Sequence, residues 1–133
     1  MATRLRPCTE ATANGRLRKA EQFLRNAEKI RELADNESED GDAFVSLCVL
    51  AGIAASDVLC CKALGHFVQG DEHRQAVDEL KKVMPDGKRL GADLNVLLQM
   101  KARAEYAAPP VSADDRKRAW RKAESLVEAA RSR

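Results

Sequence analysis

Residues 43–64 read AFVSLCVLAGIAASDVLCCKAL and are apolar on every face of a helix. A helix of this kind forms either the buried centre of a bundle or a membrane span. Its length approaches the roughly 20 residues that cross a bilayer. However, an aspartate at the centre of such a span costs roughly 2.5–3.5 kcal/mol, and Asp57 would lie there. We therefore expect a buried central helix and no membrane partner.

Amphipathic segments lie on both sides of this central helix. Apolar residues recur at three- and four-residue steps over 9–34, 71–83 and 88–107, the spacing of a helix that buries one face. Charged residues make up 33% of the chain and aromatic residues 4%, a composition that favours helices over sheets. The sequence therefore predicts an all-α fold over residues 1–133. We expect a single domain, an up-down helical bundle of about five helices around a buried second helix.

Turn and cap residues mark where these helices begin and end. The acidic loop 35–42 separates the first two helices, and Asp42 is a suitable N-cap for the second. The proline-rich loop 107–112 ends the fourth helix, because proline lacks an amide donor. Ser112 and Asp115 have the spacing of a capping box with a short acid, which predicts the start of a fifth helix.

The N-terminal residues 1–8 contain no apolar run, so we expect a flexible end and no secretory signal. The cysteines show no C-x-x-C spacing and no pattern of a secreted disulfide framework. Three of them fall in the apolar segment, where a reduced cysteine behaves as a small hydrophobic residue. We expect free thiols, a cytoplasmic protein, no metal site and no cofactor. The four cysteines stand at positions 8, 48, 60 and 61.

Lys101 and Glu105 interrupt the apolar stripe of the fourth helical segment. At about 100° per residue, both fall in the middle of this stripe. A charge taken out of water costs several kcal/mol unless it is paired. Lys101 and Glu105 can pair along the helix, and Asp57 is a candidate partner for this cluster. Together with Arg103 and Tyr106, these residues form the predicted ligand-binding site. The stripe consists of Leu90, Leu94, Leu97, Leu98 and Ala108.

Two interpretations of this cluster stay open. One is a buried ion pair that locks the fourth helix against the second. The other is a polar cleft or dimer interface, where a ligand phosphate meets Lys101 or Arg103. Cations also concentrate near the start of the chain and in the last helix, although the formal net charge is only +2. These cations form either a solvated surface or a face for nucleic acid.

Three segments and the order of the helices resemble the HEPN superfamily. The segments are 56–65 (SDVLCCKALG), 72–80 (EHRQAVDEL) and 97–106 (LLQMKARAEY). The resemblance implies a homodimeric helical domain that cleaves RNA or binds RNA or a nucleotide. It also implies a role in a toxin–antitoxin, defence or stress system, with an antitoxin or a nucleotidyltransferase as a further partner.

The nuclease branch of this superfamily carries an arginine four to six residues before a histidine. No arginine stands at that distance before His66 or His73 in this chain, and Arg103 is followed by Tyr106 instead. The resemblance therefore implies a non-nuclease component that binds RNA, a nucleotide or a partner protein. One alternative is a metal-independent RNase in which Arg103, Tyr106 and His73 are the catalytic candidates. Another is a purely structural or assembly bundle.

Overall fold

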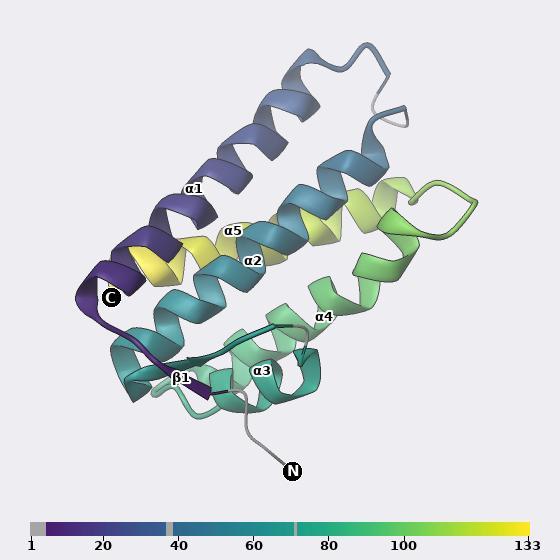
Figure 1. The fold of residues 1–133 in the computed structure, drawn as a ribbon. Helices are drawn as coiled ribbons and strands as arrows, with labels where there is room; N and C mark the ends of the chain where they lie inside the picture. Colours follow the sequence, from purple (N-terminus) through teal and green to yellow (C-terminus); the bar gives the residue numbers. More distant parts are fainter. Residues whose placement is uncertain (1–4, 37–38, 71) are drawn as a thin grey trace.

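The computed structural model describes residues 5–36, 39–70 and 72–133. Over these residues the chain is an all-α helical bundle with one small two-stranded sheet, so the predicted fold class is confirmed (Figure 1). In chain order the elements are β1 (Leu5–Pro7), α1 (Glu10–Leu33), α2 (Gly41–Leu64), β2 (His66–Val68), α3 (His73–Leu80), α4 (Gly87–Glu105) and α5 (Ala113–Ser132).

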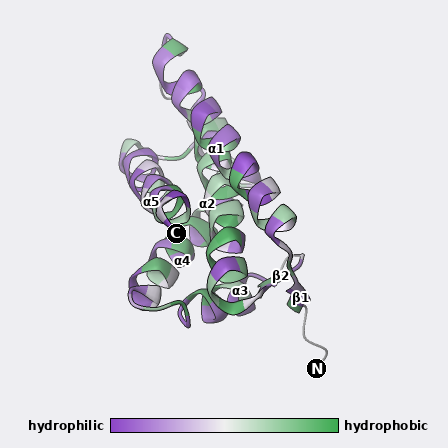
Figure 2. Ribbon diagram, turned by 90° about the vertical axis from the view of Figure 1, so that its left-hand side faces the viewer, coloured by the Kyte–Doolittle hydropathy of each residue, from purple (hydrophilic) through white to green (hydrophobic). Residues whose placement is uncertain are grey.

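Helix α2 lies at the centre of the bundle. Helices α1, α4 and α5 all pack against it, and α3 with the small sheet covers its C-terminal end (Figure 1). Most α2 residues are buried, and the helix is hydrophobic along its whole length (Figure 2). By length and composition α2 could cross a membrane, yet most of its apolar stretch is buried inside the bundle. The predicted central helix is therefore present.

The surrounding helices bury one face each, as their apolar periodicity predicts. Alanines form much of α1's buried face, which lets that helix approach α2 closely. Leucines dominate the buried face of α4, and a mixed alanine and leucine stripe lines α5. The largest fully buried side chains come from α2, α3, α4, α5 and the turn after α3. They include Val45, Leu59, Leu80, Val83, Leu90, Leu94, Leu97, Met100 and Leu126.

The helix caps agree only in part with the sequence. Ser112 caps α5, and its reciprocal bonds with Asp115 complete the predicted capping box. Helix α2, however, begins at Gly41 with Asp40 as its N-cap, so the assignment of Asp42 as the cap is wrong. Asp42 Oδ1 instead accepts a hydrogen bond from the Val111 amide at 3.0 Å. Its carboxylate therefore joins the start of α2 to the loop before α5.

Strands β1 and β2 pair antiparallel and close the end of the bundle. Cys8, directly after β1, forms a disulfide with Cys61 near the end of α2, with the Cα atoms 5.7 Å apart. The Cys8 amide also donates to the Gly65 carbonyl at 3.2 Å. The expectations of a flexible 1–8 segment and of four free thiols are therefore wrong for residues 5–8 and for these two cysteines. Residues 1–4 lie outside the described residues, and Cys48 and Cys60 are free and buried.

Candidate functional site

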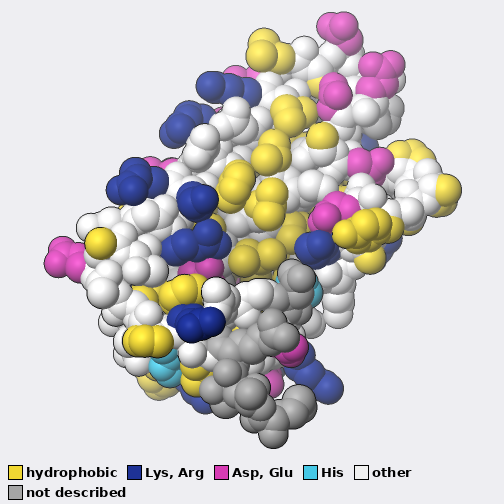
Figure 3. Space-filling model, viewed as in Figure 1, with side chains coloured by type: hydrophobic (Ala, Val, Ile, Leu, Met, Phe, Trp, Pro, Cys, Tyr) yellow, Lys and Arg dark blue, Asp and Glu magenta, His cyan; other side chains and the backbone are white. Residues whose placement is uncertain are grey.

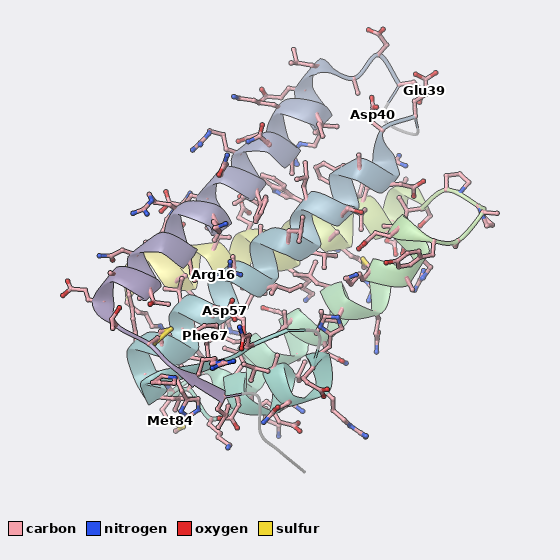
Figure 4. The ribbon with its side chains drawn as sticks, viewed as in Figure 1. Arg16, Glu39, Asp40, Asp57, Phe67 and Met84 are labelled. Atoms are coloured by element: carbon pink, nitrogen blue, oxygen red, sulfur yellow. A yellow bond between two sulfur atoms is a disulfide. The ribbon has the colours of Figure 1, made fainter. Side chains whose placement is uncertain are left out.

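Asp57 is buried on α2, where its carboxylate meets the guanidinium of Arg16 from α1 (Figure 4). Arg16 Nε donates to Asp57 Oδ2 at 2.9 Å, and Arg16 Nη2 lies 2.8 Å from the same oxygen. Burial raises the pKa of Asp57 to about 6, although Arg16 acts in the opposite direction. The predicted pairing of Asp57 with Lys101 is wrong, because Arg16 supplies the neighbouring positive charge.

Lys101 and Glu105 do pair along α4, with Nζ and Oε1 3.3 Å apart. Their side chains are 26% and 31% exposed, so the pair is not buried in the core. The buried stripe of α4 continues through Met100 and the half-buried Ala104 instead. The pair therefore lies half-buried at the edge of the apolar stripe, and not at its centre as predicted.

The other predicted site residues lie at the ends of helices. Arg103 Nη1 is 3.2 Å from the Asp115 carboxylate, and this contact joins the end of α4 to the start of α5. Tyr106 follows α4 and is 77% exposed, with Lys101 Nζ 5.7 Å from its ring centroid. His73 begins α3. Four of the predicted residues therefore gather at the end of α4, namely Lys101, Arg103, Glu105 and Tyr106. Asp57 lies in the α1–α2 contact instead, and His73 lies on α3.

A second polar cluster, centred on Glu79, joins β2 to α3. His66 Nε2 lies 2.6 Å from Glu79 Oε1, and Lys82 Nζ lies 2.5 Å from Glu79 Oε2. Burial favours the neutral carboxyl, but the hydrogen bonds from Lys82 and His66 outweigh it and lower the pKa of Glu79. Burial raises the pKa of the nearby Cys60 thiol to about 12, so Cys60 is no nucleophile at neutral pH. The Glu79 carboxylate therefore joins β2 to the end of α3 through its bonds to His66 and Lys82.

The exposed side of α2 carries leucines and an isoleucine in place of polar residues. Leu50 is 42% exposed, and Leu47 and Ile53 lie beside it on the same helix face. Figure 3 shows a band of hydrophobic side chains between α1 and α4. The band continues into a groove of about 590 Å³ between α1 and α2, where Leu33 is 81% exposed. We name this surface the apolar band: Phe23, Ile30, Leu33, Leu47, Leu50 and Ile53.

Charges of opposite sign flank the two ends of the apolar band. Acidic side chains gather where α1 meets α2, and they include Glu39 and Asp40 (Figures 3 and 4). At the other end lies Arg16, and helical periodicity places Lys19 on the same side of α1. An apolar surface with an acidic and a basic end is suited to a protein partner of matching polarity.

Among the described residues, no group of three or more His, Cys, Asp and Glu side chains could hold a metal ion. No protein-family model matches the chain, and no curated protein matches it. The resemblance to the HEPN superfamily therefore stays a prediction.

Proposed function

We propose that the protein is a homodimeric, HEPN-like binding component rather than a nuclease, and that two copies meet through the apolar band. The observation that carries this proposal is Leu50, which is 42% exposed at the middle of the most hydrophobic helix. Contiguous exposed apolar surface rimmed by charged residues is typical of an interaction site. Covering the apolar band would remove leucine and isoleucine side chains from water, each contributing up to roughly 1.5–3 kcal/mol on full burial.

The ends of the apolar band support a second copy as the occupant. A two-fold axis requires the same patch on both subunits, so the patch must be complementary to itself. With the axis near Leu50 and perpendicular to α2, the two α2 helices run antiparallel. The acidic end of one copy, with Glu39 and Asp40, then faces the end of the other where Lys19 lies beside the Arg16–Asp57 ion pair. The charges match in this arrangement and would repel in a parallel one.

The resemblance to the HEPN superfamily supports RNA or a nucleotide as the ligand, within a toxin–antitoxin, defence or stress system. The residues that the RNase alternative requires do not support cleavage. Arg103 is engaged by Asp115, and neither histidine has an arginine at the spacing of the nuclease branch. Binding without cleavage is therefore the function that the residues support best.

Sedimentation velocity on the purified chain tests the dimer. We expect a species of twice the 14.6 kDa chain mass for the wild type. Leu50→Glu should be monomeric, because a carboxylate would be buried without a partner at the interface. Met84→Glu is the matched control, because Met84 is 77% exposed and lies at the opposite end of the bundle from the acidic loop (Figure 4). It should stay dimeric, and both variants should keep the helical circular dichroism of the wild type.

A wild type that sediments as a monomer up to high micromolar concentration would overturn the homodimer. Co-purification of an antitoxin or a nucleotidyltransferase that Leu50→Glu abolishes would instead show that a different protein occupies the apolar band. A dimer that persists in Leu50→Glu would place the interface elsewhere on the molecule.

A further inference from the structure

A cleft of about 360 Å³ opens where the end of α1 and the start of α2 meet α5. Its apolar part is formed by Trp120, Phe44 and Ile30, and its charged part includes Lys117 and Arg121. Ile30 also borders the apolar band, but Trp120, Lys117 and Arg121 belong to α5 and lie outside the band. The cleft is therefore a site distinct from the surface proposed for the dimer.

The aromatic part of the cleft is held in place by its neighbours. Phe44 is 4% exposed, and its ring centroid lies 6.1 Å from that of Trp120 with the planes 23° apart. The Arg31 guanidinium carbon lies 4.1 Å from the Trp120 ring centroid, within the range of a cation–π contact. Trp120 remains partly accessible between these two groups. The cleft therefore offers a rigid apolar wall to a small molecule.

Positive charge exceeds negative charge around this wall. Among the described residues, Arg31, Arg116, Lys117 and Arg121 line the cleft, against one lining carboxylate, Asp40. Arg31 also lies 3.7 Å from Glu28 outside the cleft. Elsewhere on α5, Lys122 pairs with Asp93. Lys117 and Arg121 form no ion pair within the part of the chain that the structure describes. These two side chains are therefore available for an anion from solution.

We propose that the cleft binds a small amphiphilic anion, with an aromatic or compact apolar body against Phe44 and Trp120. Its carboxylate or phosphate would be bound by Lys117 and Arg121. The volume falls in the range of about 300–1,000 Å³ that small-molecule sites occupy. Arginine binds planar carboxylates and phosphates with paired hydrogen bonds, whereas lysine acts as a point charge. The site needs only one copy of the chain, so the inference goes beyond the proposed dimer.

Two fluorescent probes of similar shape separate charge recognition from general apolar binding. One is the anion 8-anilinonaphthalene-1-sulfonate, and the other is its uncharged relative N-phenyl-1-naphthylamine. Trp120 is the only tryptophan and lines this cleft, so its emission responds to a probe bound there. We expect the anion to saturate at one molecule per chain and to quench Trp120. The uncharged probe should bind at least tenfold more weakly.

A pair of double variants tests the cations. Lys117→Gln with Arg121→Gln should weaken binding of the anionic probe by roughly tenfold, equivalent to about 1.4 kcal/mol. Affinity for the uncharged probe should not change. Lys88→Gln with Arg74→Gln is the matched control, because it removes the same two charges from exposed positions outside the cleft. Leu50→Glu should bind the anionic probe like the wild type, which separates this site from the dimer.

Competition identifies the source of the anionic group. Displacement of the probe by 1-naphthoate indicates a carboxylate ligand, and displacement by a nucleoside monophosphate indicates a phosphate ligand. The proposal is overturned if neither displaces the probe or if both probes bind equally. It is also overturned if Trp120 is not quenched, or if the Lys117 and Arg121 double variant binds like the wild type.

Discussion

Asp57 has a partner that the pattern of α1 already indicates. Arg16 stands three residues after Ala13 and four before Ala20, and both alanines are buried on the face of α1 that packs on α2. Arg16 is thus a charge at an inward-facing position, the same signal that singled out Lys101. For Asp57 and Arg16, a charge at an inward-facing position correctly indicates two side chains that meet in the contact between α1 and α2. Lys101 is buried to a similar extent as Arg16, with 26% of its side chain exposed, but it pairs with Glu105 on its own helix and not with Asp57.

The raised pKa of Asp57 predicts how stability depends on pH. Between its ordinary value of 3.8 and about 6, the folded chain holds a proton that the unfolded chain has released. The free energy of unfolding should therefore fall as pH rises through this interval, by up to about 3 kcal/mol. Asp57→Asn carries no proton to lose, so its free energy of unfolding should lack this decrease. Urea unfolding followed by circular dichroism at a series of pH values measures both.

Asp78→Asn is the control for this experiment, because Asp78 is an exposed aspartate on α3. Its pH profile should follow the wild type. At neutral pH, Asp57→Asn should be at least as stable as the wild type, because the neutral amide avoids the cost of a buried carboxylate and Arg16 can still reach water. If the free energies of unfolding of the wild type and Asp57→Asn changed with pH in the same way, the raised pKa of Asp57 would be contradicted.

The contact between α2 and α4 depends on a glycine in the middle of α2. A Cβ atom at Gly52 would overlap Leu97 Cδ1 and lie 3.3 Å from Leu126 Cδ1. Both leucines are fully buried, so they have little room to move. Gly52 therefore sets how closely α4 and α5 approach the central helix, which its sequence position alone does not reveal.

Gly52→Ala should lower the free energy of unfolding, although alanine is the better helix former by about 1 kcal/mol. Overpacking of a buried site costs typically about 1–3 kcal/mol, which we expect to exceed that gain. Gly15→Ala on α1 is the matched control, because its nearest neighbour would be Arg18 Nη2 at 3.8 Å. It should raise stability by about 0.5–1 kcal/mol. Thermal and urea unfolding of the two variants should therefore move in opposite directions.

The disulfide joins two segments that lie far apart in the sequence, at one end of the bundle. Cys8 and Cys61 are separated by 53 residues, and the pairing of β1 with β2 brings them together. Neither the cysteine spacing nor the short strand pattern predicts this contact. Disulfides persist mainly in oxidising compartments, whereas the sequence predicts a cytoplasmic protein. The location of the protein stays a prediction.

Cys8→Ser should destabilise the fold by about 2–4 kcal/mol, because the unfolded chain regains the freedom that the cross-link removes. Dithiothreitol should lower the stability of the wild type by a similar amount. It should leave Cys8→Ser unchanged, since Cys48 and Cys60 are already free. A wild type whose unfolding curve is the same with and without reductant would show that the cross-link is not formed in solution.

The helices, the burial of α2 and the capping box at Ser112 could be predicted from the amino-acid sequence. These features depend on periodicity and on residues within one or two turns of each other, which the sequence displays directly. The partner of Asp57, the Cys8–Cys61 cross-link and the gathering of cations around Trp120 could be identified only in the folded chain. Those contacts depend on the register and crossing of separate helices, because a shift of one residue turns a helical side chain by about 100°.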